Sequence, residues 1–151
     1  ESQIGPNLLD EEPASMDHRL DVSYPGRFTL LGYDISSRRL GPNDRITLDF
    51  YFSVDGEMTE DVYFHILITP ERGPRFTGDH FPLNGTFHTN QWHTGQIIRD
   101  PIQIVVPRTI RSDVVLDLQW SSSIARRPVV LRQDGRNVRT IDLGTVEVNV
   151  P

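Results

Sequence analysis

The sequence contains no cysteine and no long apolar run, and each absence excludes a class of structure. Without cysteine there is no disulfide, no thiolate metal ligand and no cysteine nucleophile. A chain of 151 residues does not need such staples, because folding removes roughly 69% of the surface of a chain this long. No stretch approaches the roughly 18 consecutive apolar residues of a membrane-spanning helix, so we expect no transmembrane segment in this chain.

Alanine is also scarce, and this absence bears on the fold. It occurs only at Ala14 and Ala125, whereas valine, isoleucine and threonine together supply 36 residues. β-Branched side chains lose rotamer freedom in helices and fit the pleated surface of a sheet, while alanine favours helices. The composition therefore predicts an all-β protein.

Positive charge is limited and is carried by arginine alone, because the chain has 15 arginines, no lysine and a net charge of −6. Residues 1–21 hold six acids against Arg19, which leaves the rest of the chain almost neutral. Proteins that bind nucleic acid show a basic stripe, so we expect no nucleic-acid partner. Two arginine pairs, at 38–39 and 126–127, could hold an anionic ligand by bidentate contacts, but solvated turn positions also explain them.

Two regions of different composition divide the chain. Residues 1–17 combine acids, two prolines and small polar residues with few side chains to bury, and they predict an acidic, flexible N-terminal tail or linker. Residues 18–151 have the length and the apolar content of one domain. We therefore expect a single domain at 18–151, joined through the tail to something larger.

Alternation of apolar and polar residues marks the strands of this domain. The alternating apolar residues of the three clearest stretches are Ile46, Leu48, Phe50 and Phe52, then Val62, Phe64, Ile66 and Ile68, then Val114, Leu116, Leu118 and Trp120. The turn signal at 55–56 predicts that the first two stretches are antiparallel neighbours, and a change of apolar parity around Gly32 predicts a bulge or a sharp bend. About eight strands and no helical segment predict an antiparallel β-sandwich, jelly-roll-like, with the long 70–95 connection crossing between sheets.

Residues that could carry catalysis do not form a recognisable constellation. Glu57 and Glu60 flank a turn and look like solvated surface rather than a glycosidase pair across a cleft. The G-x-S-x-G pattern of serine hydrolases is missing, and the serines at 121–123 form a polar run after a strand, which predicts a loop. We therefore expect no enzymatic activity and no cofactor.

The stretch 78–95 is the candidate binding region, because it holds three of the five histidines beside aromatic and polar residues. In one interpretation an exposed indole stacks on a sugar while loop side chains hydrogen-bond it. The side chains assigned to that carbohydrate site are Trp92, His88, His80, Asp79 and Asn90. In a second interpretation Trp92 plugs the open end of the sandwich and the histidines only decorate loops.

A metal site is the third interpretation of the same stretch. His80, His88 and His93 carry imidazoles, which are good ligands for zinc and other transition metals. Their spacings of eight and five residues match no short ligand motif, so we expect no bound metal.

Several segments occur in an order that resembles a known family. They are RFTLLGYDI (27–35), LGPNDRITLDFYFS (40–53), DVYFHILI (61–68), GDHFP (78–82), QWHTGQIIRDPIQIVVP (91–107) and IDLGTVEV (141–148). Together they resemble the β-sandwich domain appended, outside the membrane, to some bacterial multi-span glycosyltransferases and related envelope proteins. His65 stands at the histidine of that family's third strand, and Trp92, Gly95 and Asp100 stand at its W–G–D run. Thr109–Ser112 and LDLQWSS (116–122) replace the family's usual penultimate strands.

The resemblance implies an accessory module on the periplasmic or cell-surface side, with transferase chemistry residing in a membrane-embedded parent chain. We therefore expect a non-catalytic, extracytoplasmic fragment of a larger or membrane-tethered protein, which binds carbohydrate or envelope polymer through the 75–95 loops. The alternative is a structural or protein-interaction domain of an envelope assembly, which would dock through a sheet edge or face. The expected partners are accordingly a glycan or envelope polymer, a protein partner, or the parent chain.

Overall fold

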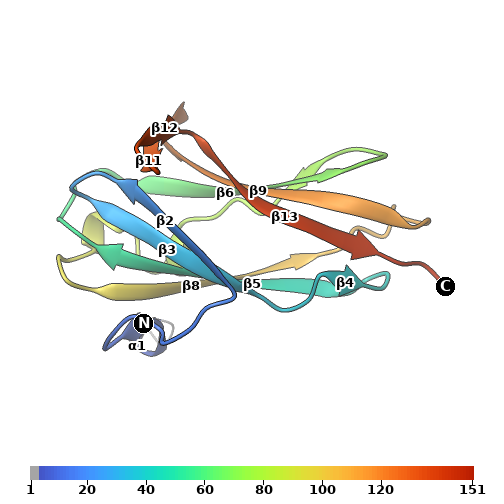
Figure 1. Cartoon of the computed structure of the whole chain (residues 1–151), viewed down its shortest axis with the longest axis horizontal. Helices are drawn as coiled ribbons and strands as arrows, with labels where there is room; N and C mark the ends of the chain where they lie inside the picture. The colour runs from blue at the N-terminus through green and yellow to red at the C-terminus, as the bar shows by residue number, and fades with distance from the viewer. Residues whose placement is uncertain (1–3) are drawn as a thin grey trace.

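Two β-sheets packed face to face make up the computed structural model, which describes residues 4–151 (Figure 1). The expected all-β sandwich is therefore confirmed. Seven of its strands are at least seven residues long. They are β2 (His18–Tyr24), β3 (Phe28–Ile35), β5 (Arg45–Val54), β6 (Val62–Pro70), β8 (Ile97–Val105), β9 (Val114–Ile124) and β13 (Thr140–Val148).

Six further strands have only two or three residues, so residues 4–151 contain thirteen strands rather than about eight. They are β1 (Leu8–Leu9), β4 (Arg39–Leu40), β7 (Phe76–Thr77), β10 (Arg127–Pro128), β11 (Leu131–Gln133) and β12 (Arg136–Val138). Strands this short show no alternation in the sequence, which is why the expected number was too low.

Within residues 4–151, helical structure is confined to single turns. These are α1 (Ile4–Asn7), η1 (Pro82–Gly85) and η2 (Thr89–Gln91). No helix formed by residues 4–151 has both the length and the apolar character that crossing a membrane requires.

One sheet has seven strands in the order β1-β8-β5-β3-β2-β11-β12, and the other has the order β4-β13-β9-β6-β7 with β10 paired to β9. The long strands pair antiparallel, while the short β4 runs parallel to β13. The 70–95 connection leaves the six-stranded sheet after β7 and reaches the seven-stranded sheet at β8. The predicted crossover in this region is therefore confirmed.

The strands β5 and β6 do not form the hairpin that the turn signal at 55–56 predicts. β5 belongs to the seven-stranded sheet and β6 to the other, and the chain between them crosses from one layer to the next (Figure 1). Gly56 donates its N–H to the Arg27 carbonyl at 3.1 Å, so this turn is tied to the turn between β2 and β3. Phe52 and Phe64 consequently meet across the core as stacked rings 5.0 Å apart, instead of side by side in one sheet.

The core lies between the sheets, as the alternation of apolar and polar residues along the strands predicts. All the apolar residues of the three alternating stretches are buried. At one end of the core Phe28, Phe52, Phe64 and Trp92 contact one another at ring-centroid distances from 5.0 to 6.3 Å. Each such aromatic contact adds about 0.5–1.5 kcal/mol to the stabilisation from burial alone. This cluster therefore helps to hold the two layers together.

A bulge interrupts β3, as the change of apolar parity around Gly32 predicts. The register between β3 and β5 shifts between Leu30 and Gly32, so Leu31 has no partner. A Cβ atom at Gly32 would lie 2.2 Å from the His18 carbonyl oxygen of β2. The close approach of the neighbouring strand therefore requires glycine at this position.

The segment before β2 lies against the seven-stranded sheet. β1 pairs with β8, and the Arg99 guanidinium donates to Asn7 Oδ1 at 2.9 Å and to the Pro6 carbonyl at 3.2 Å. Within the stretch expected as a tail, residues 4–9 thus have defined contacts with the domain. Residues 1–3 of that stretch lie outside the described residues.

Candidate functional site

A groove of about 810 Å³ lies on the outer face of the six-stranded sheet. Outward-facing side chains of β6 and β9 line it, together with the 125–128 turn, the start of β13 and Phe81. A concave surface with aromatic walls and a few polar groups is typical of small-ligand sites. The groove is therefore the candidate binding site. Its lining includes the side chains of Tyr63, His65, Phe81, Ser123, Arg126 and Arg139.

Tyr63 and Phe81 form an aromatic wall of the groove. Their ring centroids lie 4.6 Å apart with the planes inclined at 57°, and both residues are partly exposed. Tyr63 points outward because side chains alternate along β6 and its neighbours Val62 and Phe64 point into the core. The isolated bridge between Phe64 and His80 gives Phe81 the same outward direction. Half-exposed rings of this kind can stack on the apolar face of a ligand.

A row of polar side chains crosses the outer face beside this wall. Ser123 Oγ lies 2.7 Å from His65 Nε2, and His65 Nδ1 lies 3.2 Å from Asp79 Oδ1. The register produces the row, because His65 pairs with Ser121 and Tyr63 pairs with Ser123 across β6 and β9. The side chains of His65 and Asp79 remain 28% and 32% exposed, so a ligand can reach them.

Ser123, His65 and Asp79 follow the order of a serine-hydrolase triad, but the backbone beside them does not complete one. Ser123 lies within β9, in register with Tyr63 of β6 and Pro128 of β10. Backbone N–H groups of a strand point along the sheet toward neighbouring strands, not over its face. The N–H groups beside Ser123 are therefore not aimed at an oxyanion in the groove. The row is suited to hydrogen bonding a hydroxyl-rich ligand.

A buried ion pair fixes the loop that carries Asp79 and Phe81. His80 Nε2 lies 2.6 Å from Asp100 Oδ2, the side chains are 7% and 0% exposed, and the Leu83 N–H donates to Asp100 Oδ1 at 2.8 Å. Burial alone lowers the pKa of His80, but the hydrogen bond and the charge of Asp100 outweigh it and raise that pKa. With His80 held inward, Phe81 faces the groove, and Asp79 lies 3.2 Å from His65 on the same outer face.

His88 supports the groove from behind Phe81. Its ring centroid lies 4.6 Å from that of Phe81, and its Nδ1 lies 2.8 Å from Asp61 Oδ1. The next residue, Thr89, is buried, and its Oγ1 accepts the backbone N–H of Val62 at 2.9 Å. These contacts hold the η2 turn against the start of β6.

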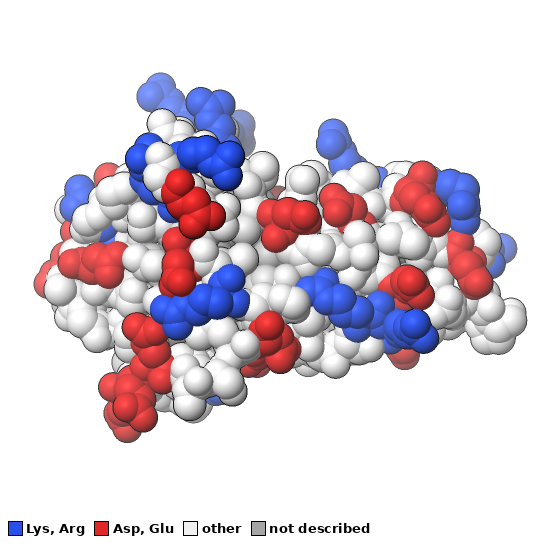
Figure 2. All heavy atoms as spheres, in the orientation of Figure 1, with Lys and Arg blue, Asp and Glu red and all other residues white. Residues whose placement is uncertain are grey.

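The chain between β9 and β13 forms two hairpins beside the groove. β10 turns back along β9, and β11 with β12 extends the other sheet by pairing with β2. Arg126 and Arg139 from this part of the chain line the groove. Figure 2 shows arginine side chains gathered over β11 and β12, at the top of the view.

Trp92 does not offer the exposed indole face of the carbohydrate interpretation. It is 1% exposed, it packs against Phe28, Phe52 and Phe64, and its Nε1–H donates to the Phe87 carbonyl at 3.1 Å. Its position in the sandwich agrees with the second interpretation, in which the indole fills the interior. A ligand therefore cannot stack on Trp92.

The other four side chains assigned to that site do not converge either. His80 is buried in the ion pair described above. Asp79 does not line the groove and contacts it through His65. His88 likewise contacts it through Asp61 and Phe81. Asn90 is exposed on η2 and does not line the groove.

The three histidines of the metal interpretation also point to different partners. His80 faces the core, His88 faces Asp61, and His93 lies on the surface 3.5 Å from Glu57. Within residues 4–151, no three His, Asp or Glu side chains lie close enough together to hold a metal ion.

Sequence reasoning did not identify Tyr63, His65 and Ser123 as site residues. Outward positions of a strand look like ordinary solvated surface, and the serines at 121–123 were expected in a loop, whereas they belong to β9. Two signals did point here: the 75–95 loops, which supply Phe81 and Asp79, and the arginine pair at 126–127, through its anionic-ligand interpretation.

No protein-family model matches the chain, and no curated protein matches it. The resemblance to the appended domain of membrane glycosyltransferases therefore stays a prediction.

Proposed function

We propose that the domain is a non-catalytic carbohydrate-binding module whose site is the groove on the outer face of the six-stranded sheet. The observation that carries this is the Tyr63–Phe81 wall standing beside the Ser123–His65–Asp79 row. A pyranose ring has an apolar face and a hydroxyl-bearing edge. The groove offers an aromatic surface for the first and hydrogen-bonding side chains for the second.

The groove is held in shape before any ligand arrives, which supports a binding role. Tyr63, His65 and Ser123 stand on paired strands, and the buried His80–Asp100 pair fixes the loop. Side chains on paired strands lose less conformational entropy on binding than side chains on free loops, so more of the contact energy remains as affinity. The 75–95 connection contributes Phe81 to the lining and Asp79 to the polar row, β6 and β9 contribute Tyr63, His65 and Ser123, and the 125–128 turn and the start of β13 complete the groove.

An extracytoplasmic location and an accessory role in a larger protein belong to the same proposal. They are supported by the resemblance of the segments between 27 and 150, and the ligand would then be a glycan or an envelope polymer. The non-catalytic part is supported by the place of Ser123 inside a paired strand, where backbone N–H groups face neighbouring strands.

A glycan array followed by calorimetric titration of the best ligand tests the proposal. Tyr63→Ala and Phe81→Ala should each weaken binding about tenfold, which equals roughly 1.4 kcal/mol, because each removes half of the aromatic wall. Tyr24→Ala is the matched control, since Tyr24 is also partly buried and packs edge-on against Phe28, but on β2 outside the groove.

Two results would contradict the carbohydrate proposal. One is the absence of binding to every glycan on the array, and the other is an equal loss of affinity in the Tyr24→Ala control. Capture of a specific protein partner by a domain without any sugar affinity would support the structural alternative instead.

A further inference from the structure

We infer that the groove takes an acidic glycan, whose sugars carry carboxylate, phosphate or sulfate groups, and that Arg126 and Arg139 bind those groups. The inference rests on the proposed function and adds the chemical class of the ligand. It starts from two guanidinium groups that line the same groove as Tyr63 and Phe81.

Neither guanidinium is used by the fold. Within residues 4–151, Arg126 and Arg139 have no side-chain hydrogen bond and no ion pair, and both are exposed. Arg132 of the same chain segment is different, because it donates to Asn137 Oδ1 at 2.6 Å and to the Gly135 carbonyl at 2.8 Å. Arg132 therefore stabilises its own hairpin, whereas Arg126 and Arg139 keep their donors available to a ligand.

Two carboxylates beside the aromatic wall are hydrogen-bonded to histidines. Asp61, which lines the groove, lies 2.8 Å from His88, and Asp79 lies 3.2 Å from His65. Within residues 4–151, neither carboxylate forms an ion pair with Arg126 or Arg139. Both guanidinium groups therefore keep their donors available to an anionic group of a ligand.

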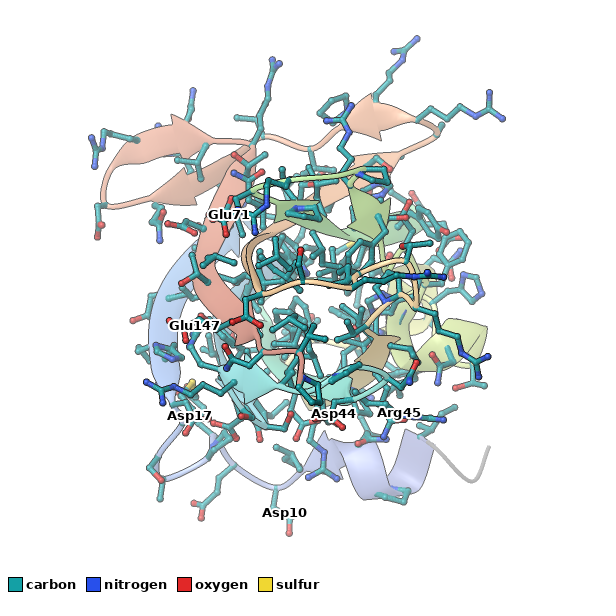
Figure 3. The ribbon with its side chains drawn as sticks, turned by 90° about the vertical axis from the view of Figure 1, so that its right-hand side faces the viewer. Asp10, Asp17, Asp44, Arg45, Glu71 and Glu147 are labelled. Atoms are coloured by element: carbon teal, nitrogen blue, oxygen red, sulfur yellow. The ribbon has the colours of Figure 1, made fainter. Side chains whose placement is uncertain are left out.

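Charge is also separated along the molecule. Residues 126–139 contain five arginines and a single acid, Asp134, although the whole chain has a net charge of −6. Figure 3 labels Asp10 at the foot of the molecule, while the nitrogen-tipped side chains of the hairpins project from the opposite end. Screening at physiological salt acts over about 8 Å, so the acidic N-terminal segment does not offset the arginines at the groove.

The backbone at Arg126 adds an independent observation. Ala125 and Arg126 occupy the left-handed region, with φ of 48° and 67°. A two-residue hairpin turn of this kind favours Asn-Gly, and a residue with a Cβ in this region costs about 1–2 kcal/mol. Strain of this kind clusters at active sites and ligand clamps. Here it places an arginine at the rim of the groove.

Arginine suits an acidic sugar better than a neutral one. Its planar guanidinium binds carboxylate or phosphate through two parallel hydrogen bonds, and these charge-assisted bonds are about twice as strong as neutral ones. A sugar ring stacked on Tyr63 and Phe81 would carry its acidic group toward the rim, where the arginines stand.

Matched acidic and neutral polymers test the inference. Polygalacturonate is titrated against its fully methyl-esterified form, and dextran sulfate against dextran, so that the arms separate carboxylate from sulfate recognition. The variant Arg126→Gln/Arg139→Gln is compared with the control Arg108→Gln/Arg111→Gln. The control removes the same charge from an exposed loop that precedes the start of β9, whereas Arg126 follows the end of β9.

We expect at least one acidic polymer to bind tenfold or more tightly than its neutral counterpart. That preference should disappear in Arg126→Gln/Arg139→Gln, persist in Arg108→Gln/Arg111→Gln, and weaken as salt is raised. Equal affinity for the acidic and neutral forms would overturn the inference, and so would an equal loss in both double variants. If acidic and neutral glycans bind equally well, and Tyr63→Ala weakens that binding about tenfold, the proposed function stands while the acidic preference falls. Failure of every polymer and every arrayed glycan removes both.

Discussion

His80 and Asp100 form a buried ion pair that joins the two sheets, with Nε2 and Oδ2 2.6 Å apart. His80 bridges to Phe64 of β6 in one sheet, and Asp100 belongs to β8 in the other. The pair therefore has two effects. It ties the layers together at the end of the sandwich, and it turns the residues on either side of His80 outward, Phe81 to the groove and Asp79 to His65.

Removing the carboxylate of this pair should be strongly destabilising. Asp100→Ala leaves His80 and the Leu83 N–H without their buried partner, which we expect to lower the free energy of unfolding by about 3–5 kcal/mol. The measurement is the urea unfolding midpoint. Asp100→Asn, which keeps an acceptor for Leu83, should lose less and serves if the alanine variant does not fold.

The exposed pair of His93 and Glu57 is the control for this experiment. Their side chains are 68% and 64% exposed and 3.5 Å apart, so Glu57→Ala should cost less than about 1 kcal/mol. If Asp100→Ala shifted the midpoint no more than Glu57→Ala does, the buried pair would not have the role described here.

Stability should depend on pH through His80. Asp100 raises the pKa of His80 above its ordinary value of 6.5, so the folded protein binds this proton more tightly than the unfolded chain does. The resulting stability is complete below about pH 6.5 and is lost as the pH rises through the raised pKa. Unfolding free energies of the protein and of His80→Gln should therefore move closer together as the pH rises above 6.5. A difference that stays constant or widens would mean that His80 is not protonated in the fold.

Trp92 should matter for stability and not for ligand contact. Trp92→Ala removes a ring that is 1% exposed in the aromatic cluster, and we expect a loss of about 3–5 kcal/mol in thermal or urea unfolding. Trp92→Phe should fold with a smaller loss and keep the glycan affinity of the groove. Weaker glycan binding by a well-folded Trp92→Phe variant would restore the exposed-indole interpretation.

Ser122 and Ser123 are neighbours on β9 that face opposite ways. Ser122 is 2% exposed, and its Oγ has no hydrogen-bond partner among residues 4–151, whereas Ser123 Oγ contacts His65. Ser122→Ala should therefore leave the melting temperature unchanged or raise it, because an unpaired buried hydroxyl is unfavourable. Ser123→Ala should instead weaken glycan binding, since it releases His65. Melting and titration are measured on both variants. If Ser122→Ala weakened glycan binding while Ser123→Ala left it unchanged, the side chain that faces the groove would be that of Ser122 instead of Ser123.

Much of the fold could be predicted because it is encoded locally. Alternation over four or more residues identified the inward side chains of β5, β6 and β9, and glycine at position 32 marked the bulge. Strand pairing is not local, so the turn signal at 55–56 predicted a hairpin where the chain changes sheets. Strands of two residues, such as β1 and β10, leave no pattern to detect.

The candidate site was harder to predict because it depends on what covers each face. Tyr63 and His65 alternate outward on β6, like any solvated positions, and that face is concave because Phe81, the 125–128 turn and the start of β13 stand around it. Trp92 shows the reverse case. A tryptophan in a loop-rich stretch is exposed or buried according to whether that stretch closes the end of the sandwich, and spacing along the chain does not say which.

Amide chemical-shift mapping by NMR tests most directly whether the groove is the binding site. The titration uses the glycan or acidic polymer fragment that binds best. The account predicts shifts at Tyr63, His65, Ser123 and Arg126, with the Trp92 indole N–H unchanged. Shifts centred on the amides of 88–95, with those four groove residues unmoved, would contradict it.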